Sequence, residues 1–235
     1  MTADDFWAGS AITAVNRDGF GSRIAAFDPG PPTPHRWSRP GNLISLRQVP
    51  SVLDPVLSAR TSTRTFAPTP ITENDLTAVL GFLAERPDGH RSYPAAGALY
   101  AIGLVAWLFG IDHPLHGHTA QYHPAEHALA DLGKAPAWAD EAIAFTGDPT
   151  SDPPPVFLGL FADLDPLHAK YGDRGDRFAL LEAGEILQQL SLAVAARGLA
   201  GYAVGGSIDD RLIALAGLQP VRARFVVGYA FGNPT

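Results

Sequence analysis

Residues 91–109 read RSYPAAGALYAIGLVAWLF, and this stretch constrains the fold more than any other part of the chain. From Leu99 to Phe109 almost every residue is apolar or aromatic, which is typical of a strand buried on both faces. The small residues of the turn before it would let a flat ring approach the backbone closely. An ordinary loop leading into a strand would have the same composition. The stretch therefore predicts a buried strand and leaves the role of the turn open.

The other predicted elements follow no regular strand–helix–strand rhythm. The residue pattern predicts helices at 52–60, 72–83 and 176–197, and further strands at 156–161 and 221–231. Thr72 is a good N-cap for its helix, and Gly198 is placed to end the long one. This irregular order favours an α+β fold over a doubly wound sheet.

A change of composition near residue 50 predicts two parts. Residues 1–50 are rich in Pro, Gly and Arg, with PGPPTPH at 29–35, and show no sustained helical or strand period. We expect an extended N-terminal arm that either wraps a partner subunit or forms a loose tail. Residues 51–235 are enough for one packed domain in a chain that is 46% hydrophobic.

The composition also argues against several kinds of function. The chain contains no Cys, which rules out thiolate metal sites and a cysteine nucleophile. A net charge of -7 argues against nucleic acid, because such binding depends on Lys and Arg at phosphates. The first ten residues carry acids where a secretory signal would be basic, and the most apolar window, 95–111, is too short to cross a membrane. We therefore expect a cytoplasmic protein with no nucleic-acid or membrane partner.

Three more clusters have both a functional and a structural interpretation. RTSTR at 60–64 combines guanidinium groups and hydroxyls that suit a phosphate, but a solvated basic loop has the same pattern. The glycine pair at 205–206, after Tyr202, is either a turn or a site that presents backbone amides to a ligand. Lys170 and Tyr171 precede the long helix. Both side chain types keep their protons in neutral water, so either could act as a base only if burial or a neighbouring cation lowered its pKa. The alternative is that the two residues belong to a surface loop.

In their order and spacing, the four clusters resemble the SagB-type dehydrogenases of the FMN-dependent nitroreductase superfamily. The matching patterns are R-x-S-x-R-x-F from Arg60, P-x-A-G-A-L-Y from Pro94, K-Y-G-x-R from Lys170 with R-x-x-L-L-E-A-G just after it, and G-G-x-x-D-D from Gly205. The resemblance covers roughly residues 53–228. It implies a nitroreductase-like α+β fold, in which helices flank a mixed, mainly antiparallel sheet, and a homodimer. A helix that is apolar on almost every face over 186–196 must be buried on all sides, either at the centre of the domain or against a second subunit, and the homodimer would provide that cover.

The resemblance implies a role for each matched residue. Those implied to hold the FMN phosphate and ribityl chain are Arg60, Ser62 and Arg64; those lining the flavin are Pro94, Ala95, Ala96 and Leu99; those presenting N–H groups near N5 are Gly205 and Gly206; the catalytic pair is Lys170 and Tyr171. Two departures from the family predict weaker FMN retention. Ala95 stands where the family usually has Ser, and the chain stops at Thr235, before a basic residue that usually helps to hold the phosphate.

The chemistry that the resemblance implies is the oxidation of thiazoline or oxazoline rings to thiazole or oxazole, on a peptide or on a carrier-bound intermediate. FMN would accept a hydride, and Tyr171 or Lys170 would take the proton, with Tyr171 preferred and Lys170 stabilising its phenolate. Dioxygen would reoxidise the flavin, because the chain has no G-x-G-x-x-G dinucleotide pattern. A cyclodehydratase or synthetase is a candidate partner.

Two rival functions remain open at this stage. One is an NAD(P)H-dependent nitroreductase or ene-type flavoprotein, which NADH would bleach rapidly. The other is a non-catalytic scaffold member of a peptide-modifying complex, which would be colourless when purified.

A group of histidines invites a metal interpretation, and its members are His113, His116, His118, His123 and His127. Only His123 and His127 have helical i, i+4 spacing, and no carboxylate completes a known signature, so we predict no metal site. The resemblance instead implies a hairpin over 122–129.

Overall fold

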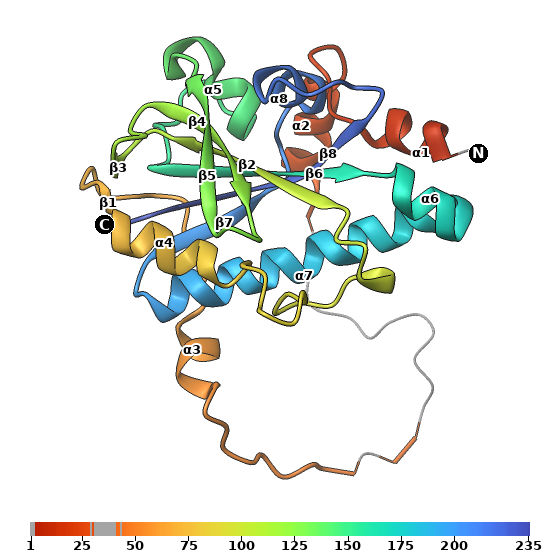
Figure 1. Cartoon of the computed structure of the whole chain (residues 1–235), viewed down its shortest axis with the longest axis vertical. Coiled ribbons are helices and arrows are strands. Elements are labelled where there is room, and N and C mark those ends of the chain that lie inside the picture. Colours follow the sequence, from red (N-terminus) through yellow and green to blue (C-terminus); the bar gives the residue numbers. More distant parts are fainter. Residues whose placement is uncertain (1–2, 29, 31–40, 43) are drawn as a thin grey trace.

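A computed structural model of the chain describes residues 3–28, 30, 41–42 and 44–235. Its centre is a six-stranded sheet in the order β5-β4-β2-β6-β8-β7, and every neighbouring pair is antiparallel (Figure 1). The strands are β2 (Ile102–Leu108), β4 (His118–His123), β5 (Ala128–Lys134), β6 (Val156–Asp163), β7 (Ala200–Val204) and β8 (Ala223–Gly232). A separate pair, β1 (Ile71–Thr72) and β3 (Ile111–Asp112), is parallel. The predicted α+β class with a mainly antiparallel sheet is confirmed.

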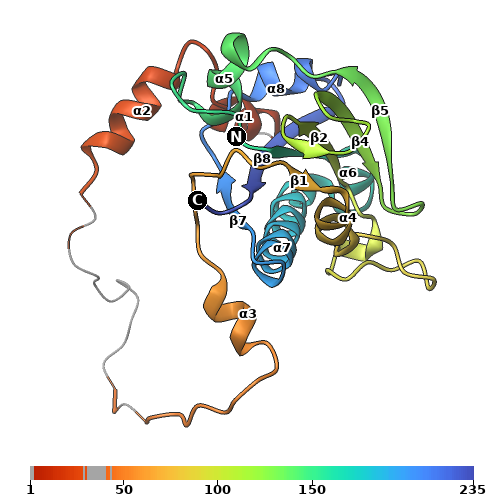
Figure 2. The same cartoon turned by 90° about the vertical axis from the view of Figure 1, so that its left-hand side faces the viewer.

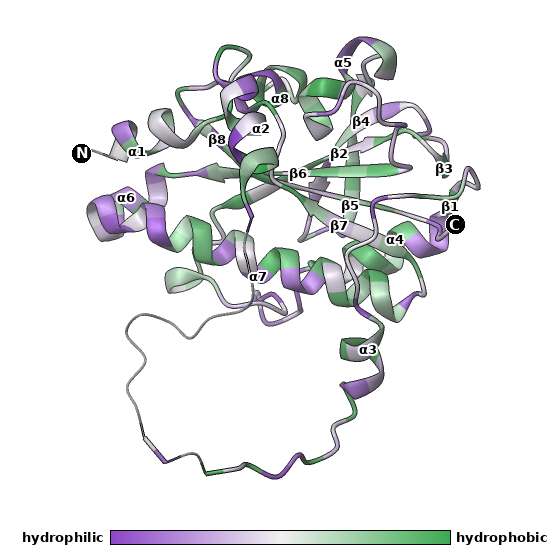
Figure 3. Cartoon of the chain, turned by 180° about the vertical axis from the view of Figure 1, so that it is seen from behind, coloured by the Kyte–Doolittle hydropathy of each residue, from purple (hydrophilic) through white to green (hydrophobic). Residues whose placement is uncertain are grey.

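The two central strands, β2 and β6, are almost wholly buried, as their apolar sequences predict. Every residue of β6 except its last is buried, and Figure 3 shows this strand hydrophobic over much of its length. The predicted strand from Leu99 starts later, at Ile102. The reason is a short 3-10 turn, η1 (Ala96–Ala98), in which Gly97 has a φ of 61°. The small residues thus form a tight turn before the strand.

Helices cover both faces of the sheet (Figure 2). The helices on one face are α7 (Gly175–Ala196) and α4 (Glu73–Gly81), whose apolar side chains join one core cluster. Those on the other face are α5 (Trp138–Thr146) and α8 (Asp209–Leu215), which pack into a second cluster. The shorter elements are α1 (Ala3–Ser10), α2 (Arg17–Ala26), α3 (Asp54–Ala59), α6 (Asp165–Tyr171) and η2 (Gly172–Arg174).

The ends of α4 and α7 follow the local rules read from the sequence. Thr72 caps α4, and its hydroxyl accepts a hydrogen bond from the Asp75 backbone at 3.1 Å. The hydrogen bonds from Thr72 and Arg197 hold the pKa of the Asp75 carboxyl below its usual value. Arg197 is the last residue before Gly198, whose φ of 68° ends α7 in the left-handed conformation as predicted.

The N-terminal arm differs from its prediction as an extended segment, because α1 and α2 are helical. The physical cause at α1 is tertiary packing, since Trp7 and Ile12 are each only 8% exposed against the domain. The segment 44–50 has no helix or strand and exposes Ile44 and Leu46. Of the proline-rich stretch 29–35, only Gly30 belongs to the described residues.

The exposed apolar side chains of the long helix α7 lie outside the stretch 186–196 for which the sequence predicted a need for cover. Its second half buries Ile186, Leu190 and Val194 within the chain itself. The large apolar side chains that stay exposed, Leu180 and Leu181, lie in the first half. The need for covering by a second subunit therefore falls on the first half, and the homodimer stays a prediction.

Residues 165–196 are long and apolar enough to cross a membrane by length and composition alone. In the structure this stretch is broken at η2, and α7 lies along the sheet with Asp176 and Glu182 among its buried residues. Its position is that of a core helix.

Candidate active site

The predicted catalytic pair lies at the end of α6, directly against the Gly97 turn. Lys170 Nζ is 5.4 Å from the centre of the Tyr171 ring, so the two side chains form one polar group. Gly97 leaves just enough room for them. A methyl group at position 97 would lie 2.6 Å from Tyr171 Oη and nearer still to Lys170 Nζ. Two clusters more than 70 residues apart in the sequence thus meet in one site.

The pair combines one mobile and one fixed side chain. Lys170 is exposed, whereas Tyr171 is half-buried and packs edge-on against Phe178 of α7, with ring centres 4.8 Å apart. The phenol is therefore held in place while its oxygen faces the turn. An ammonium and a phenol at one turn are side chain types that can take part in proton transfer.

A single carboxylate oxygen fixes the two ends of the segment that carries the pair. Asp176 Oδ1 accepts a hydrogen bond from His168 Nε2 at 2.9 Å, so one end of the segment is tied to the other. The same oxygen accepts the indole N–H of Trp7 at 3.1 Å. Helix α1 is thereby attached to the segment that carries the predicted catalytic pair, although it lies about 160 residues away in the sequence.

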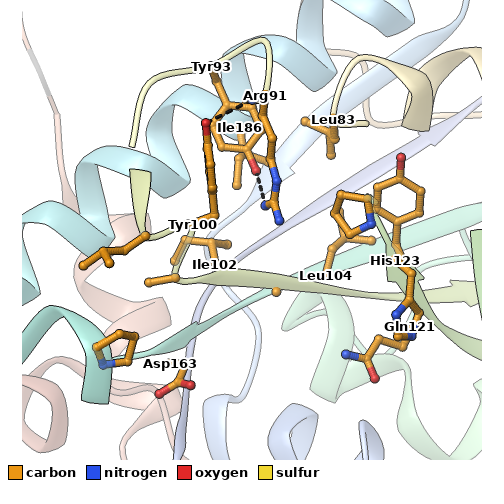
Figure 4. Close-up of a pocket in the computed structure, with 16 residues that line it drawn as sticks. Leu83, Arg91, Tyr93, Tyr100, Ile102, Leu104, Gln121, His123, Asp163 and Ile186 are labelled. Carbon is orange, nitrogen blue, oxygen red and sulfur yellow. Dashed lines mark hydrogen bonds between the residues drawn. The ribbon is translucent and has the colours of Figure 1, made fainter. Parts of the chain in front are cut away.

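A cavity of about 330 Å³ lies next to the same turn and is lined in part by Leu99, Tyr100 and Ala101, the residues that follow it (Figure 4). It exists because β2 and β4 separate at this end. Their ladder reaches only Val105 and Gln121, while β2 begins at Ile102 and β4 continues to His123. The lining includes apolar residues, which are Leu83, Leu99, Ile102, Leu104 and Ile186, and polar residues, which are Arg91, Gln121, His123 and Asp163.

Glu182 of α7 anchors the start of β2 beside this cavity. Its two carboxylate oxygens accept the backbone N–H groups of Ala101 at 3.2 Å and Ile102 at 3.0 Å. Burial raises the pKa of Glu182, and these hydrogen bonds and the charge of Arg91 oppose that rise. Burial likewise raises the pKa of Tyr93. The site thus contains a buried acid whose acceptors are already in use.

The predicted phosphate-binding residues lie beside the edge strand β7. The backbone N–H of Thr63 donates to Gly201 at 3.1 Å, which aligns this segment with β7. Arg64 lies over the ring of Tyr202 at 5.4 Å, and Arg60 Nη1 donates to Ser62 Oγ at 3.4 Å. Both arginines are exposed, and within the described part of the chain neither has an ion-pair partner. Two unpaired guanidinium groups beside hydroxyls suit a phosphate.

The glycine pair at the end of β7 has a packing role and leaves an open position. A methyl group at Gly206 would lie 3.2 Å from the carbonyl oxygen of Thr146, at the end of α5. Gly205 has open space where its side chain would be, so a ligand can approach its backbone there.

The model of the nitroreductase family matches residues 57–233. The chain belongs to the nitroreductase family. Membership places it among the flavoprotein oxidoreductases of the nitroreductase superfamily and confirms the predicted fold.

Individual relatives agree with this family membership. "Putative nitroreductase MJ1384" of Methanocaldococcus jannaschii is 26% identical over 167 residues, which are 68% of this chain and 81% of that protein. A chain of the E. coli microcin synthetase McbBCD complex, solved with truncated pro-MccB17 bound, aligns with a TM-score of 0.68 and 20% identity. The alignment covers 96% of this chain and 84% of that chain. A "putative nitroreductase in complex with fmn" from Desulfovibrio desulfuricans aligns with a TM-score of 0.53 and 18% identity, over 80% and 88% of the two chains.

In this nitroreductase-family chain, the predicted site residues separate into two groups. The first, beside β7, comprises Arg60, Ser62, Arg64, Gly205 and Gly206; the second, around η1, comprises Pro94, Ala95, Ala96, Leu99, Lys170 and Tyr171. Tyr171 contacts Phe178, whereas Arg60 lies near Tyr229, whose hydroxyl is bonded to Ser191. Phe178 and Ser191 are about 20 Å apart along α7. Among the described residues, no hydrogen bond, ion pair or ring contact joins the groups.

Sequence reasoning missed the residues that hold the segment of the predicted catalytic pair in place. Trp7 lies 169 residues before Asp176 in the sequence, and no local pattern connects it with His168 and Asp176. Glu182 gave a signal, as an acid that directly follows the apolar residues 178–181 and also matches the family pattern.

Two of the histidines predicted not to form a metal site have separate local partners. His118 is bonded to Asp131 at 2.9 Å, and His127 to Tyr122 at 2.8 Å, in the hairpin of β4 and β5 implied by the resemblance. Over the described residues, no group of three or more His, Cys, Asp or Glu side chains is arranged to hold a metal.

Proposed function

We propose that this chain is an FMN-dependent dehydrogenase that oxidises thiazoline or oxazoline rings, carried by a peptide or by a carrier-bound intermediate, to thiazole or oxazole. The observation that carries the proposal is the Lys170–Tyr171 pair against the Gly97 turn. An ammonium and a phenol beside a backbone without side chains suit the removal of a proton from a flat ring.

The residues of the β7 group fit an FMN phosphate. Arg60, Ser62 and Arg64 offer unpaired guanidinium groups and a hydroxyl, and Gly205 offers open backbone near the other end of the cofactor. Pro94, Ala95, Ala96 and Leu99 would line the ring. Bound FMN would supply the hydride acceptor for the reaction. An FMN complex is known for the Desulfovibrio desulfuricans protein of the same fold.

In the proposed reaction, the chain's own side chains handle the proton. Tyr171 Oη takes a proton from a ring carbon of the azoline, and Lys170 stabilises the phenolate that receives it. The two electrons leave the substrate as a hydride, and dioxygen is the final oxidant. Because the two side chains act as one unit, removing both should cost little more than removing the more important one.

A homodimer completes the proposed site. The β7 group and the η1 group lie at different parts of α7, and Leu180 and Leu181 leave an apolar face on that helix. A second copy would cover this face and bring its η1 group to the first copy's β7 group. The fold shared with a chain of the microcin synthetase complex supports a synthetase or cyclodehydratase as a further partner. We also propose a cytoplasmic location.

The decisive experiment measures colour and mass. Purified protein should be yellow, and incubation with azoline-bearing peptides in air should remove two hydrogens per ring, measured by intact mass. Tyr171→Phe is the matched control, since it should stay yellow and lose most of the activity. Colourless protein that stays inactive with added FMN would refute the proposal.

Family membership itself supports one rival, an NAD(P)H-dependent nitroreductase. Rapid bleaching of the bound flavin by NADH, with no mass change in the peptides, would establish that rival.

A further inference from the structure

We infer that the cavity behind the η1 turn is a binding site for a carboxylate attached to a small apolar or aromatic group. Its volume of about 330 Å³ is that of a small-ligand pocket. None of the residues assigned to FMN or to catalysis lines it except Leu99. It is therefore a separate compartment that shares one wall with the proposed active site.

The electrostatics of the cavity favour an anion. Arg91 is the one Arg or Lys among its lining residues, and in the described structure it makes no ion pair. A guanidinium has five N–H groups, of which Nη1 donates to Tyr93 Oη at 2.8 Å. Its Nε is buried and has no hydrogen-bond partner among the described residues. Nη2 is not buried in this way and makes no hydrogen bond in the described structure, so a carboxylate in the cavity would give it an acceptor and would supply the missing charge.

The surroundings hold the Arg91 side chain in position for such a ligand. Its guanidinium lies 4.4 Å from the centre of the Tyr100 ring, and its backbone N–H donates to Tyr100 Oη at 3.0 Å. Figure 4 shows Arg91 extending from its loop toward β2 and β4. Glu182 is the nearby acid, but both of its oxygens accept backbone N–H groups of β2. It therefore lowers the local positive charge without pairing with Arg91.

The other walls define the rest of the ligand. Leu83, Leu104 and Ile186 are apolar and favour a hydrocarbon or aromatic group. Asp163, which accepts the N–H of Asp165 at 3.1 Å, disfavours a second negative charge. The expected ligand is thus a monocarboxylate with an apolar or ring substituent. Its source is either an acidic group of the substrate or a separate small acid.

The first test compares benzoate with its neutral analogue benzamide by calorimetry on the flavin-loaded protein. Benzoate should bind at least tenfold more tightly than benzamide, because only the carboxylate pairs with Arg91. Arg91→Gln should abolish this preference, and Arg91→Lys should weaken it. The control is Arg86→Gln, because Arg86 is exposed, pairs with Asp88 and lies outside the cavity.

Equal binding of benzoate and benzamide by the unmodified protein would overturn the proposal, even if the variants failed to fold. Unchanged benzoate preference in a folded Arg91→Gln protein would overturn it as well. Neither measurement needs turnover, so the result is independent of the proposed oxidation. Inhibition of azoline oxidation by benzoate then supports the site and identifies the source. Competitive inhibition assigns the carboxylate to the substrate, and binding without competition assigns it to a separate acid.

Discussion

Replacing Gly97 with Ala tests whether the η1 turn seats the catalytic pair. Position 97 has a φ of 61°, a conformation that costs an L-residue about 1–2 kcal/mol. The added methyl group would lie 2.6 Å from Tyr171 Oη, so a side chain has to move. Lys170 is exposed and can yield, but Tyr171 is packed against Phe178 at 4.8 Å. A shift of about 1 Å at reacting groups can cost about 10²-fold in rate.

We therefore expect Gly97→Ala to retain FMN and to lower kcat for azoline oxidation by about 10- to 100-fold. The melting temperature should fall by roughly 2–8 °C, since about 1–2 kcal/mol shifts a domain of this size by that amount. The assay is the rate of two-hydrogen loss by intact mass, together with a thermal melt followed by flavin fluorescence.

Gly217→Ala is the matched control for Gly97→Ala. Gly217 has a φ of 68°, but nothing lies within 4 Å of where its side chain would be. It should show a similar loss of stability with no loss of rate. If both variants slow oxidation equally, or if Gly97→Ala oxidises azolines at the original rate, then the contact with Lys170 and Tyr171 has no catalytic meaning.

Four other predictions follow from the same geometry. Arg60→Ala and Arg64→Ala should each lower FMN occupancy, measured by the visible spectrum, because each removes a charge-assisted phosphate contact; full occupancy in both would place the phosphate elsewhere. Tyr171→Phe should slow oxidation by about 10²–10⁴-fold at unchanged occupancy, and an unchanged rate would make the pair structural. Trp7→Phe should lower kcat more than it changes KM, because Asp176 loses the indole N–H; an altered KM alone would contradict this. Burial raises the pKa of Asp209 to about 6, so its contribution to the free energy of unfolding is present at pH 4 and is lost as pH rises through 6, and Asp209→Asn should remove this dependence in urea titrations.

Local signals were sufficient for the elements that bury themselves or carry their own end signals. The strand at 156–161 is apolar throughout, so its burial between β2 and β8 follows from composition. Helix α4 was predicted from Thr72, whose side chain caps it in the structure. Helix α1 was missed because its stability comes from Trp7 packing against the distant domain, and no local periodicity encodes that contact.

The same distinction applies to the site. Each cluster could be found in the sequence because its residue types suit phosphate or proton chemistry. The sequence could not show which clusters meet, because the contact of Gly97 with Lys170 depends on how α6 packs after β6. The sequence also could not show that Arg64 and Lys170 lie near different parts of α7. A resemblance to a family transfers residues to positions, but it does not show which of them lie together in the folded chain.

The backbone of the η1 turn connects the catalytic pair with the cavity behind it. Besides Gly97, the residues Ala98 and Tyr100 have positive φ values, 55° and 48°, which are uncommon for residues with side chains. Such conformations persist only where the surroundings enforce them. Here Tyr100 is fixed by the backbone N–H of Arg91 and by the stacked guanidinium, while Glu182 holds the following strand. A ligand that binds Arg91 would therefore contact the residues that hold the turn in this conformation. Tyr171 Oη lies directly against that turn at Gly97.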